Sequence, residues 1–347
     1  MGKKVLMKGN EALAEAAIRS GCRYYYGYPI TPQTELAEYM AKHLPKAGGT
    51  FLQAESEIAA ISMVYGTSAA GKRVMTSSSS PGISLKQEGI SYLAGSNLPA
   101  VIVNVQRGGP GLGGIQPSQS DYFQAVKGGG HGDYHLLVLA PSTVQEMADL
   151  TVLAFDLADK YRVQAMILAD GTVGQMMEPV ELPEPPEVRC DKPWALTGKG
   201  KGPSKYITSL SLSPEELEQW NLNNFEKYKR ICECEQRAEE FLVDDAEVCV
   251  VAFGISARVA RSAVIAARRK GIKAGLIRPI TLYPFPVDTL RRAASHVQRF
   301  ISAELNMGQM IEDVKLAIDC SRSVKLCNRT GGVILTPEEV LAAIEAE

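Results

Sequence analysis

The stretch Tyr28-Pro29-Ile30-Thr31-Pro32 decides how the fold of this chain is interpreted. Each proline fixes its own φ angle and biases the residue before it away from the helical region, so the stretch is a short rigid arch. It follows the β-prone run Arg23-Tyr24-Tyr25-Tyr26, which places it at the carboxyl end of a predicted strand. Ligands of α/β proteins bind at that edge. The alternative is a structural turn, with Thr31 capping a helix and Pro32 in its first position.

Strand-like and helix-like segments alternate on both sides of the arch, from residue 5 to about residue 175. We expect strands near 23–26, 50–53, 73–76, 100–105, 135–139 and 163–168. Helical patterns stand between them, at 10–20, 31–43, 56–69 and 143–161. The run Ala100–Val105 is almost wholly apolar, as is typical of a strand covered on both faces. This order predicts an α/β fold with a doubly wound parallel sheet.

The composition changes after Met177, where proline, acidic residues and then glycine and lysine become frequent. We interpret 178–245 as a linker that ends in a charged helix, which is either a solvated arm or a partner-facing surface. A second α/β unit follows, with strands expected near 248–252, 273–277, 299–303 and 324–327. The predicted organisation is therefore a first domain over 1–177, a connecting segment over 178–245, and a second domain over 246–347.

Composition excludes several classes of function. The chain has 347 residues, with 37 basic and 39 acidic side chains, so no excess of positive charge suggests nucleic acid. No apolar run has the length of a membrane span and no signal-peptide core follows Met1, so we expect a cytoplasmic protein. The seven cysteines are scattered, which predicts reduced thiols rather than a disulfide framework. Neither cysteines nor histidines have metal-ligand spacing, so we predict no metal site and no iron–sulfur cluster on this chain.

A glycine-rich stretch follows the strand expected at 100–105. Gly109 to Gly114 formally fit G-x-G-x-x-G, but the next predicted strand ends in Ala140-Pro141 rather than in the acidic residue that a dinucleotide site needs. A mobile loop over a ligand and a plain long turn are the other interpretations. Arg107 precedes the glycines, where its guanidinium is suited to grip a carboxylate. A surface salt bridge is its structural alternative.

Three further groups are candidates for chemistry. Glu55 and Glu57 stand between a predicted strand and an apolar helix, where an acid either stabilises the helix dipole or acts in a buried site. The run Thr76-Ser77-Ser78-Ser79-Ser80-Pro81-Gly82 ends another strand, and helix capping is the favoured role for most of its serines. His131 stands among glycines, which predicts exposure to a cleft without assigning it a role.

Together these segments resemble the α subunit of the thiamine-diphosphate-dependent 2-oxoacid:ferredoxin oxidoreductases. The resemblance covers nearly the whole chain in order, and its motifs are 28–32, 55–60, 79–82, 106–110, 278–286 and 304–309. It implies two doubly wound domains: a pyrimidine-binding domain of the thiamine-enzyme type, followed by one like the carboxyl-terminal domain of transketolase.

The resemblance also implies roles for individual residues. Glu57 matches the glutamate that binds the aminopyrimidine ring nitrogen N1′ of the cofactor and promotes loss of the thiazolium proton. Tyr28, Pro29 and Ile30 would line the same cofactor pocket. Thr31 would face the substrate, and Arg107 would meet the carboxylate of the 2-oxoacid. The implied reaction is oxidative decarboxylation to an acyl-coenzyme A, with electrons passed to ferredoxin.

The resemblance further implies that the site is shared with other chains. Thiamine enzymes hold the diphosphate through Mg²⁺ with a G-D-G segment and a later asparagine, and neither Asp133 nor Asp170 is followed by such an asparagine. We therefore expect a β subunit to carry the diphosphate and Mg²⁺ site and an iron–sulfur subunit to carry the [4Fe-4S] clusters. The stretch 111–122 resembles the 2-oxoisovalerate branch more than the 2-oxoglutarate branch. A non-catalytic assembly subunit and a NAD-linked dehydrogenase remain as alternatives from other classes.

Overall fold

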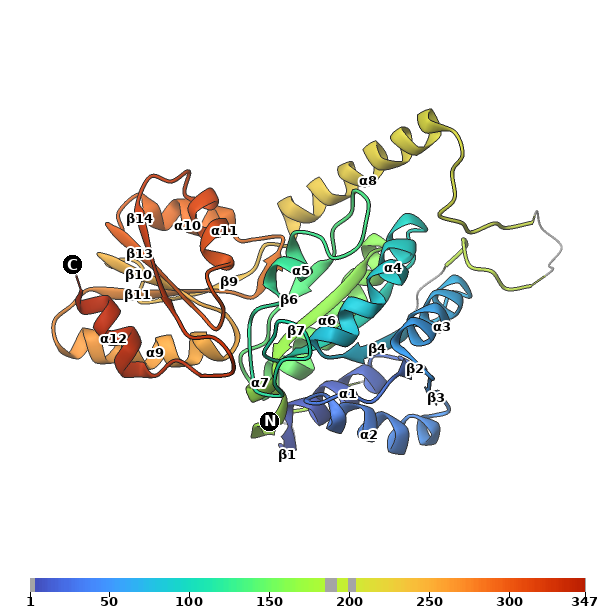
Figure 1. The fold of residues 1–347 in the computed structure, drawn as a ribbon, viewed down its shortest axis with the longest axis horizontal. Helices are drawn as coiled ribbons and strands as arrows, with labels where there is room; N and C mark the ends of the chain where they lie inside the picture. Colours follow the sequence, from blue (N-terminus) through green and yellow to red (C-terminus); the bar gives the residue numbers. More distant parts are fainter. Residues whose placement is uncertain (1–3, 185–191, 199–203, 347) are drawn as a thin grey trace.

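A computed structural model describes residues 4–184, 192–198 and 204–346 of the chain. Figure 1 shows two α/β units side by side, each a sheet covered by helices on both faces. The first unit contains, in chain order, β1 (Val5–Lys8), α1 (Gly9–Arg19), β2 (Tyr24–Gly27), α2 (Thr34–His43), the 3₁₀ turn η1 (Pro45–Ala47), β3 (Thr50–Gln53), α3 (Glu57–Ala69), β4 (Val74–Ser78), α4 (Ser80–Gly95), β5 (Ala100–Gln106), α5 (Tyr122–Val126), β6 (Leu137–Leu139), α6 (Val144–Tyr161), β7 (Gln164–Asp170), α7 (Gly171–Gln175) and β8 (Met177–Val180).

A long helix connects this unit to the second one. Figure 1 shows that residues 204–213 extend away from the first unit and that the helix then returns toward the second sheet. The elements of this part of the chain are α8 (Pro214–Cys234), β9 (Ala238–Phe241), β10 (Val248–Val251), α9 (Gly254–Arg269), β11 (Ala274–Pro279), β12 (Thr281–Tyr283), α10 (Val287–Ala294), β13 (Arg299–Glu304), α11 (Met310–Ala317), β14 (Ser323–Asn328) and α12 (Pro337–Glu345).

The first sheet has seven strands in the order β12-β6-β7-β5-β4-β2-β3. All neighbours from β6 to β3 are parallel, and β5 and β7 are both fully buried at its centre. Successive residues of a strand face opposite sides. Val101 and Val103 of β5 therefore pack toward α1 and α6, whereas Ile102 packs toward α3 and α4. The almost continuous apolar run of β5 is explained by these two helical layers.

The second sheet has the order β14-β13-β10-β11-β9. Its first four strands are parallel and β9 is antiparallel. Helices α9 and α12 cover one face, and α10 and α11 cover the other. The predicted α/β class with two doubly wound parallel sheets is thus confirmed, with one antiparallel edge strand in each sheet. Among the described residues, no helix is long and apolar enough to cross a membrane.

Several local expectations differ from the structure. The helix expected from Thr31 begins at Thr34. The charged helix expected at the end of the 178–245 segment ends at Cys234, and Ala238–Phe241 then pairs with β11 as a strand. Strands β1, β8 and β12 were not expected, because such short segments become strands only when a distant partner supplies their hydrogen bonds. The predicted connectors at 178–187 and 197–204 lie partly outside the described residues.

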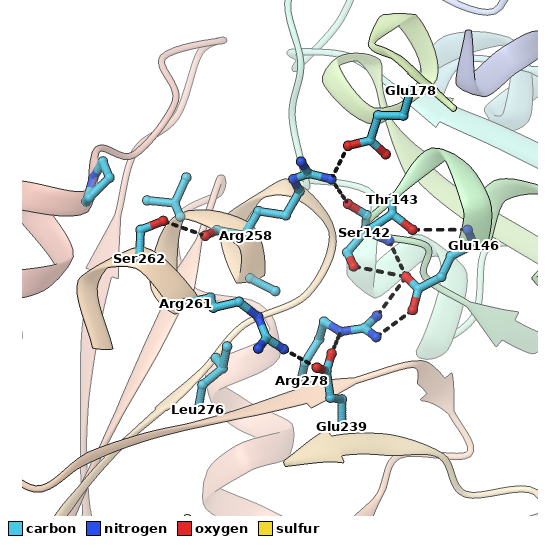
Figure 2. Close-up of a pocket in the computed structure, with 13 residues that line it drawn as sticks. Ser142, Thr143, Glu146, Glu178, Glu239, Arg258, Arg261, Ser262, Leu276 and Arg278 are labelled. Atoms are coloured by element: carbon cyan, nitrogen blue, oxygen red, sulfur yellow. Dashed lines mark hydrogen bonds and ion pairs between the residues drawn. The ribbon is translucent and has the colours of Figure 1, made fainter. Parts of the chain in front are cut away.

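The two units are joined by paired strands and by charge. Strand β12 pairs with β6 and so closes the first sheet with a segment from the second half of the chain. Figure 2 shows the groove next to this junction, a cavity of about 790 Å³. In it Arg278 donates to both oxygens of Glu146 on α6, at 2.6 and 3.0 Å, and to Glu239 on β9 at 2.7 Å. Arg258 donates to Glu178 at 2.9 Å.

Candidate active site

The predicted site residues lie at one edge of the first sheet. The arch at 28–32 follows β2, Glu57 follows β3, the serine run ends β4, and Arg107 follows β5. These four strands are parallel neighbours in the order β5-β4-β2-β3, so their carboxyl ends meet at the same edge. Such an edge is where α/β proteins bind their ligands. The fold therefore brings together segments that are far apart in the sequence.

The arch is fixed from several sides. Asn10 of α1 donates through Nδ2 to the carbonyl of Pro32 at 2.9 Å. The side chain of Gln33 donates to the carbonyl of Tyr28 at 3.4 Å and accepts from the Ser77 hydroxyl at 2.5 Å. Helix α2 begins only at Thr34, with Gln33 at its N-cap position. The alternative in which Thr31 caps the helix is therefore wrong, and Thr31 is free of that role.

Arg107 joins the arch to the glycine-rich loop. Its Nη1 donates to the carbonyl of Thr31 at 3.0 Å, and its Nη2 donates to the carbonyl of Leu112 at 3.2 Å. The side chain is buried, and its Nε has no hydrogen-bond partner within the described chain. Arg107 forms no ion pair with a described residue, so the alternative of a surface salt bridge is wrong. The N–H of Nε thus remains available to a ligand.

Ser80 connects Arg107 to a buried carboxylate. The Ser80 hydroxyl accepts from the main-chain N–H of Arg107 at 3.0 Å and donates to Asp121 at 2.6 Å. Asp121 also accepts from Asn104 at 2.9 Å. Burial raises the pKa of Asp121, and these two hydrogen bonds oppose the shift. The network fixes the main chain at Arg107 against the first turn of α4.

Glu57 is the first residue of α3 and lies against the start of α4. Ser56 caps α3 by accepting from the N–H of Ala59 at 3.2 Å. The Glu57 side chain is buried, and its carboxylate accepts no hydrogen bond from a described residue. A Cβ built on Gly82 would lie 2.6 Å from Oε1 of Glu57, so only glycine leaves room for the carboxylate there. An acidic side chain can stabilise a helix dipole while it is exposed, so that role alone does not explain the burial of Glu57.

Other polar atoms around the start of α4 also lack partners. They are buried, make no hydrogen bond within the described chain, and comprise Ser78 Oγ, Ser79 Oγ, Lys86 Nζ and Gln87 Nε2. Ser79 occupies the N-cap position of α4 but its side chain makes no capping hydrogen bond, so the capping role favoured from sequence is wrong for Ser79. Buried polar groups are usually paired with protein or water, so this cluster marks the start of α4 as a candidate binding site. Lys86 carried no signal in the sequence, because its burial depends on tertiary packing.

The glycine-rich loop closes on itself rather than opening a helix. Gly108 donates to the carbonyl of Gln116 at 2.9 Å, and Gly114 donates to the carbonyl of Gly108 at 2.9 Å. Gly113 has a φ of +57°, and a Cβ there would lie 1.9 Å from the Gly108 oxygen. The next helix, α5, starts only at Tyr122. A dinucleotide fingerprint needs a helix directly after its glycines, so that interpretation is wrong.

The remaining predicted residues surround this edge at different depths. Tyr28 and Pro29 are exposed and line a hollow of about 270 Å³ between α2 and β3, and Ile30 is half-buried. Glu57 and Arg107 do not line that hollow. His131 is exposed and stands beside Tyr92, in a separate hollow away from Glu57. No group of three or more His, Cys, Asp or Glu among the described residues could hold a metal ion.

The two doubly wound units, with the candidate residues at the carboxyl edge of the first sheet, define an α/β protein of the class that binds a ligand at that edge. Residues 15–229 match the family described as pyruvate flavodoxin/ferredoxin oxidoreductase, thiamine diphosphate-binding. Residues 246–340 match pyruvate:ferredoxin oxidoreductase core domain II. The chain belongs to this oxidoreductase family, which confirms the resemblance drawn from the motifs.

Curated relatives align over nearly the full length. The chain is 56% identical to ketoisovalerate oxidoreductase subunit VorB of Methanothermobacter thermautotrophicus, over 98% of this chain and 96% of that one. It is 38% identical to 2-oxoglutarate synthase subunit KorA of Methanocaldococcus jannaschii, over 99% of both chains. The whole chain is thus related to single subunits of 2-oxoacid oxidoreductases.

Solved structures agree with the fold. The 2-oxoglutarate:ferredoxin oxidoreductase of Magnetococcus marinus superposes with a TM-score of 0.88 at 30% identity, over 99% of this chain. This chain spans 65% of that longer one. A split-gene transketolase superposes with a TM-score of 0.61 at 15% identity, over 99% of this chain and 98% of its own, which shows a shared fold alone.

Proposed function

We propose that this chain is the pyrimidine-binding subunit of an oxidoreductase that converts 2-oxoisovalerate and coenzyme A to an acyl-coenzyme A and CO₂, with electrons passed to ferredoxin. The observation that carries the proposal is the 56% identity, over nearly the full length, to a ketoisovalerate oxidoreductase subunit. The 2-oxoglutarate subunits are more distant, at 38% identity. 2-Oxoglutarate is therefore the second candidate substrate.

The residues at the sheet edge fit the cofactor that this family binds. Glu57 offers a buried carboxylate with no partner in the described chain, which suits a protonated ring nitrogen. Thiamine diphosphate, when bound, supplies the nucleophilic carbon that attacks the 2-oxo group. Glu57 would hold the aminopyrimidine ring of the cofactor through its ring nitrogen N1′ and would support proton removal there. Tyr28, Pro29 and Ile30 form the wall on the cofactor side of the arch.

Thr31 and Arg107 form the substrate side of the proposed site. The Thr31 hydroxyl makes no hydrogen bond to a described residue, and the Nε of Arg107 has no partner within the described chain. A guanidinium held by two main-chain carbonyls is already oriented, so it loses little freedom when it meets a carboxylate. Arg107 thereby fixes the acid group of the 2-oxoacid. A non-catalytic assembly subunit would not need these unpaired groups.

We further propose that partner chains complete the site. A β subunit would hold the diphosphate and Mg²⁺, and an iron–sulfur subunit would carry the [4Fe-4S] clusters to ferredoxin. The support is a group of exposed apolar side chains on elements that adjoin the candidate site, namely β3, α3, α4 and the glycine-rich loop: Leu52, Ile58, Leu85, Leu112 and Ile115. Exposed apolar side chains that gather near one another are typical of protein interfaces. We also propose that the first domain covers 1–177, the connecting segment 178–245 and the second domain 246–347.

The test is copurification followed by a substrate panel. The tagged chain is expressed with its partners, and the complex is assayed with 2-oxoisovalerate, 2-oxoglutarate and pyruvate, using ferredoxin or viologen as acceptor. We expect activity that requires thiamine diphosphate and coenzyme A, with the highest kcat/KM for 2-oxoisovalerate. The isolated chain should be inactive. A higher kcat/KM for 2-oxoglutarate would reject the substrate, and activity without the cofactor would reject the proposal.

A further inference from the structure

Lys86 is a buried cation that the proposed reaction does not yet use. It lies in the second turn of α4, its side chain is fully buried, and its Nζ has no hydrogen-bond partner within the described chain. It forms no ion pair with a described residue. An ammonium in this condition is costly unless a nearby charge or a ligand compensates it. A buried Lys86 ammonium therefore needs a compensating charge or ligand nearby.

The geometry of α4 directs Lys86 toward Glu57. Gly82 and Lys86 are four residues apart, so they lie on the same face of the helix, and helical side chains tilt toward the amino terminus. The stem of Lys86 thus runs toward Gly82, whose α-carbon packs against the Glu57 carboxylate. Burial lowers the pKa of Lys86 to about 8, and the charge of Glu57 opposes this shift. Glu57 is the only charged group that acts on Lys86 in this way.

The other charged groups near the first turn of α4 are engaged elsewhere. Asp121 accepts hydrogen bonds from Ser80 and Asn104, and Arg107 donates to the carbonyls of Thr31 and Leu112. Glu88, the next acid along α4, accepts from the Tyr92 hydroxyl at an exposed position. Glu57 and Lys86 therefore stand as an isolated pair of opposite charges. Neither is satisfied by a hydrogen bond from this chain.

We propose that Lys86 is a positioning residue for Glu57, in which the buried positive charge of Lys86 attracts the Glu57 carboxylate and holds it beside the first turn of α4. The inference rests on the proposed function, because an ionised Glu57 is what accepts the protonated ring nitrogen of thiamine diphosphate. A cation close to a carboxyl group favours its charged form, and the attraction is stronger where the cation is shielded from solvent. Solvent does not screen the charge of Lys86, because its side chain is fully buried.

The test measures thiamine diphosphate binding by the assembled complex as a function of pH. Lys86→Met removes the charge and keeps a long apolar side chain, and Lys46→Met at an exposed position is the matched control. For the wild type and the control we expect little change of affinity between pH 6 and pH 8. For Lys86→Met we expect affinity to fall about tenfold for each pH unit lost below the midpoint of the change, and to recover at alkaline pH.

A double-mutant cycle separates this role from a purely structural one. If Lys86 acts through Glu57, the variant Glu57→Gln/Lys86→Met binds the cofactor as Glu57→Gln does, and its affinity does not depend on pH. A pH-independent loss in Lys86→Met, unchanged affinity, or additive losses in the double variant would overturn the inference. If Lys86→Met alone does not assemble, recovery of assembly in the double variant supports the pair, and failure to recover refutes it.

The Glu57–Lys86 pair can still be tested if the proposed function is wrong. A wild-type complex that binds no thiamine diphosphate would reject the proposed function itself. The free energies of unfolding in urea of the wild type, Glu57→Gln, Lys86→Met and the double variant would then still show whether Glu57 and Lys86 stabilise each other. Coupled losses support the electrostatic pair, and additive losses refute it.

Discussion

Arg107 donates a hydrogen bond through Nη1 to the main-chain carbonyl of Thr31 at 3.0 Å, across 76 positions of sequence. The bond ties the loop after β5 to the arch after β2, with β4 between those strands in the sheet. It uses the carbonyl of Thr31 and leaves the hydroxyl without a partner in the described chain. The hydrogen bond therefore fixes the main chain of the arch and leaves the Thr31 side chain unengaged.

The first prediction concerns Glu57. In the assembled complex, Glu57→Gln should lose most of the turnover, by a factor of about 10² or more, because an amide is a poor acceptor for a protonated ring nitrogen. Assembly should persist, because the side chain has the same size. Glu55→Gln is the matched control, since Glu55 is exposed two residues away. Steady-state kinetics with a pull-down checks both, and equal activities of the two variants would contradict the assignment.

Arg107 gives the second prediction. Arg107→Met should raise the KM for the 2-oxoacid by about 10- to 100-fold, which corresponds to the loss of a charged hydrogen bond worth about 1.5–3 kcal/mol. Arg107→Lys should recover only part of this, because an ammonium cannot hold the Thr31 and Leu112 carbonyls and a carboxylate in the same plane. The control is Arg230→Met at an exposed position of α8. A KM unchanged in Arg107→Met would remove this residue from the substrate side.

The third prediction tests the exposed apolar side chains beside the candidate site. Leu85 is 51% exposed on α4, and we expect Leu85→Asp to prevent copurification of the partner chain while this chain still folds. Leu316→Asp, on α11 of the second unit, changes a side chain that is 64% exposed and should leave assembly intact. Size-exclusion chromatography of the coexpressed subunits distinguishes them. Loss of assembly in both variants, or in neither, would argue against an interface at Leu85.

The fourth prediction is a pH dependence of stability. The pKa of Lys86 is lowered to about 8 by burial, below its ordinary 10.5, so the folded state releases this proton earlier than the unfolded state. Stability should therefore rise as pH increases from about 8 to about 10.5, by up to about 3 kcal/mol. Lys86→Met should show a smaller rise, because Lys227, whose pKa burial also lowers to about 8, still contributes over the same range. Urea unfolding of the full chain across that range measures it, and parallel curves for the two proteins would reject the effect.

The fifth prediction compares two arginines in the groove between the units (Figure 2). The Arg278 side chain is 6% exposed and pairs with Glu146 and Glu239, so Arg278→Met should cost about 1.5–3 kcal/mol, because Glu146 loses its cation although Glu239 keeps Arg261. The Arg258 side chain is 35% exposed, and Arg258→Met should cost about 1 kcal/mol or less. Urea midpoints give the comparison. Equal losses would show that burial does not set the strength of this junction.

The sequence predicted much of the site because its segments are locally distinctive. The arch, Glu57 and Arg107 each follow a short β-prone run, and such positions fall at one edge when the strands are parallel. The sequence did not reveal Lys86, the missing capping bond of Ser79, or strand β12. Their burial and pairing depend on neighbours that are distant in the chain.

By itself the sequence determined the α/β class and the two sheets, and it singled out the candidate site residues, because apolar periodicity and turn residues act over a few neighbouring positions. Only the tertiary structure decided which strand ends adjoin, and with them the bond from Arg107 to Thr31 and the burial of Lys86 near Glu57. Strand order and burial come from contacts between distant segments. Local patterns do not encode those contacts. The charged groups that stay unpaired can be identified only once the contacts have formed.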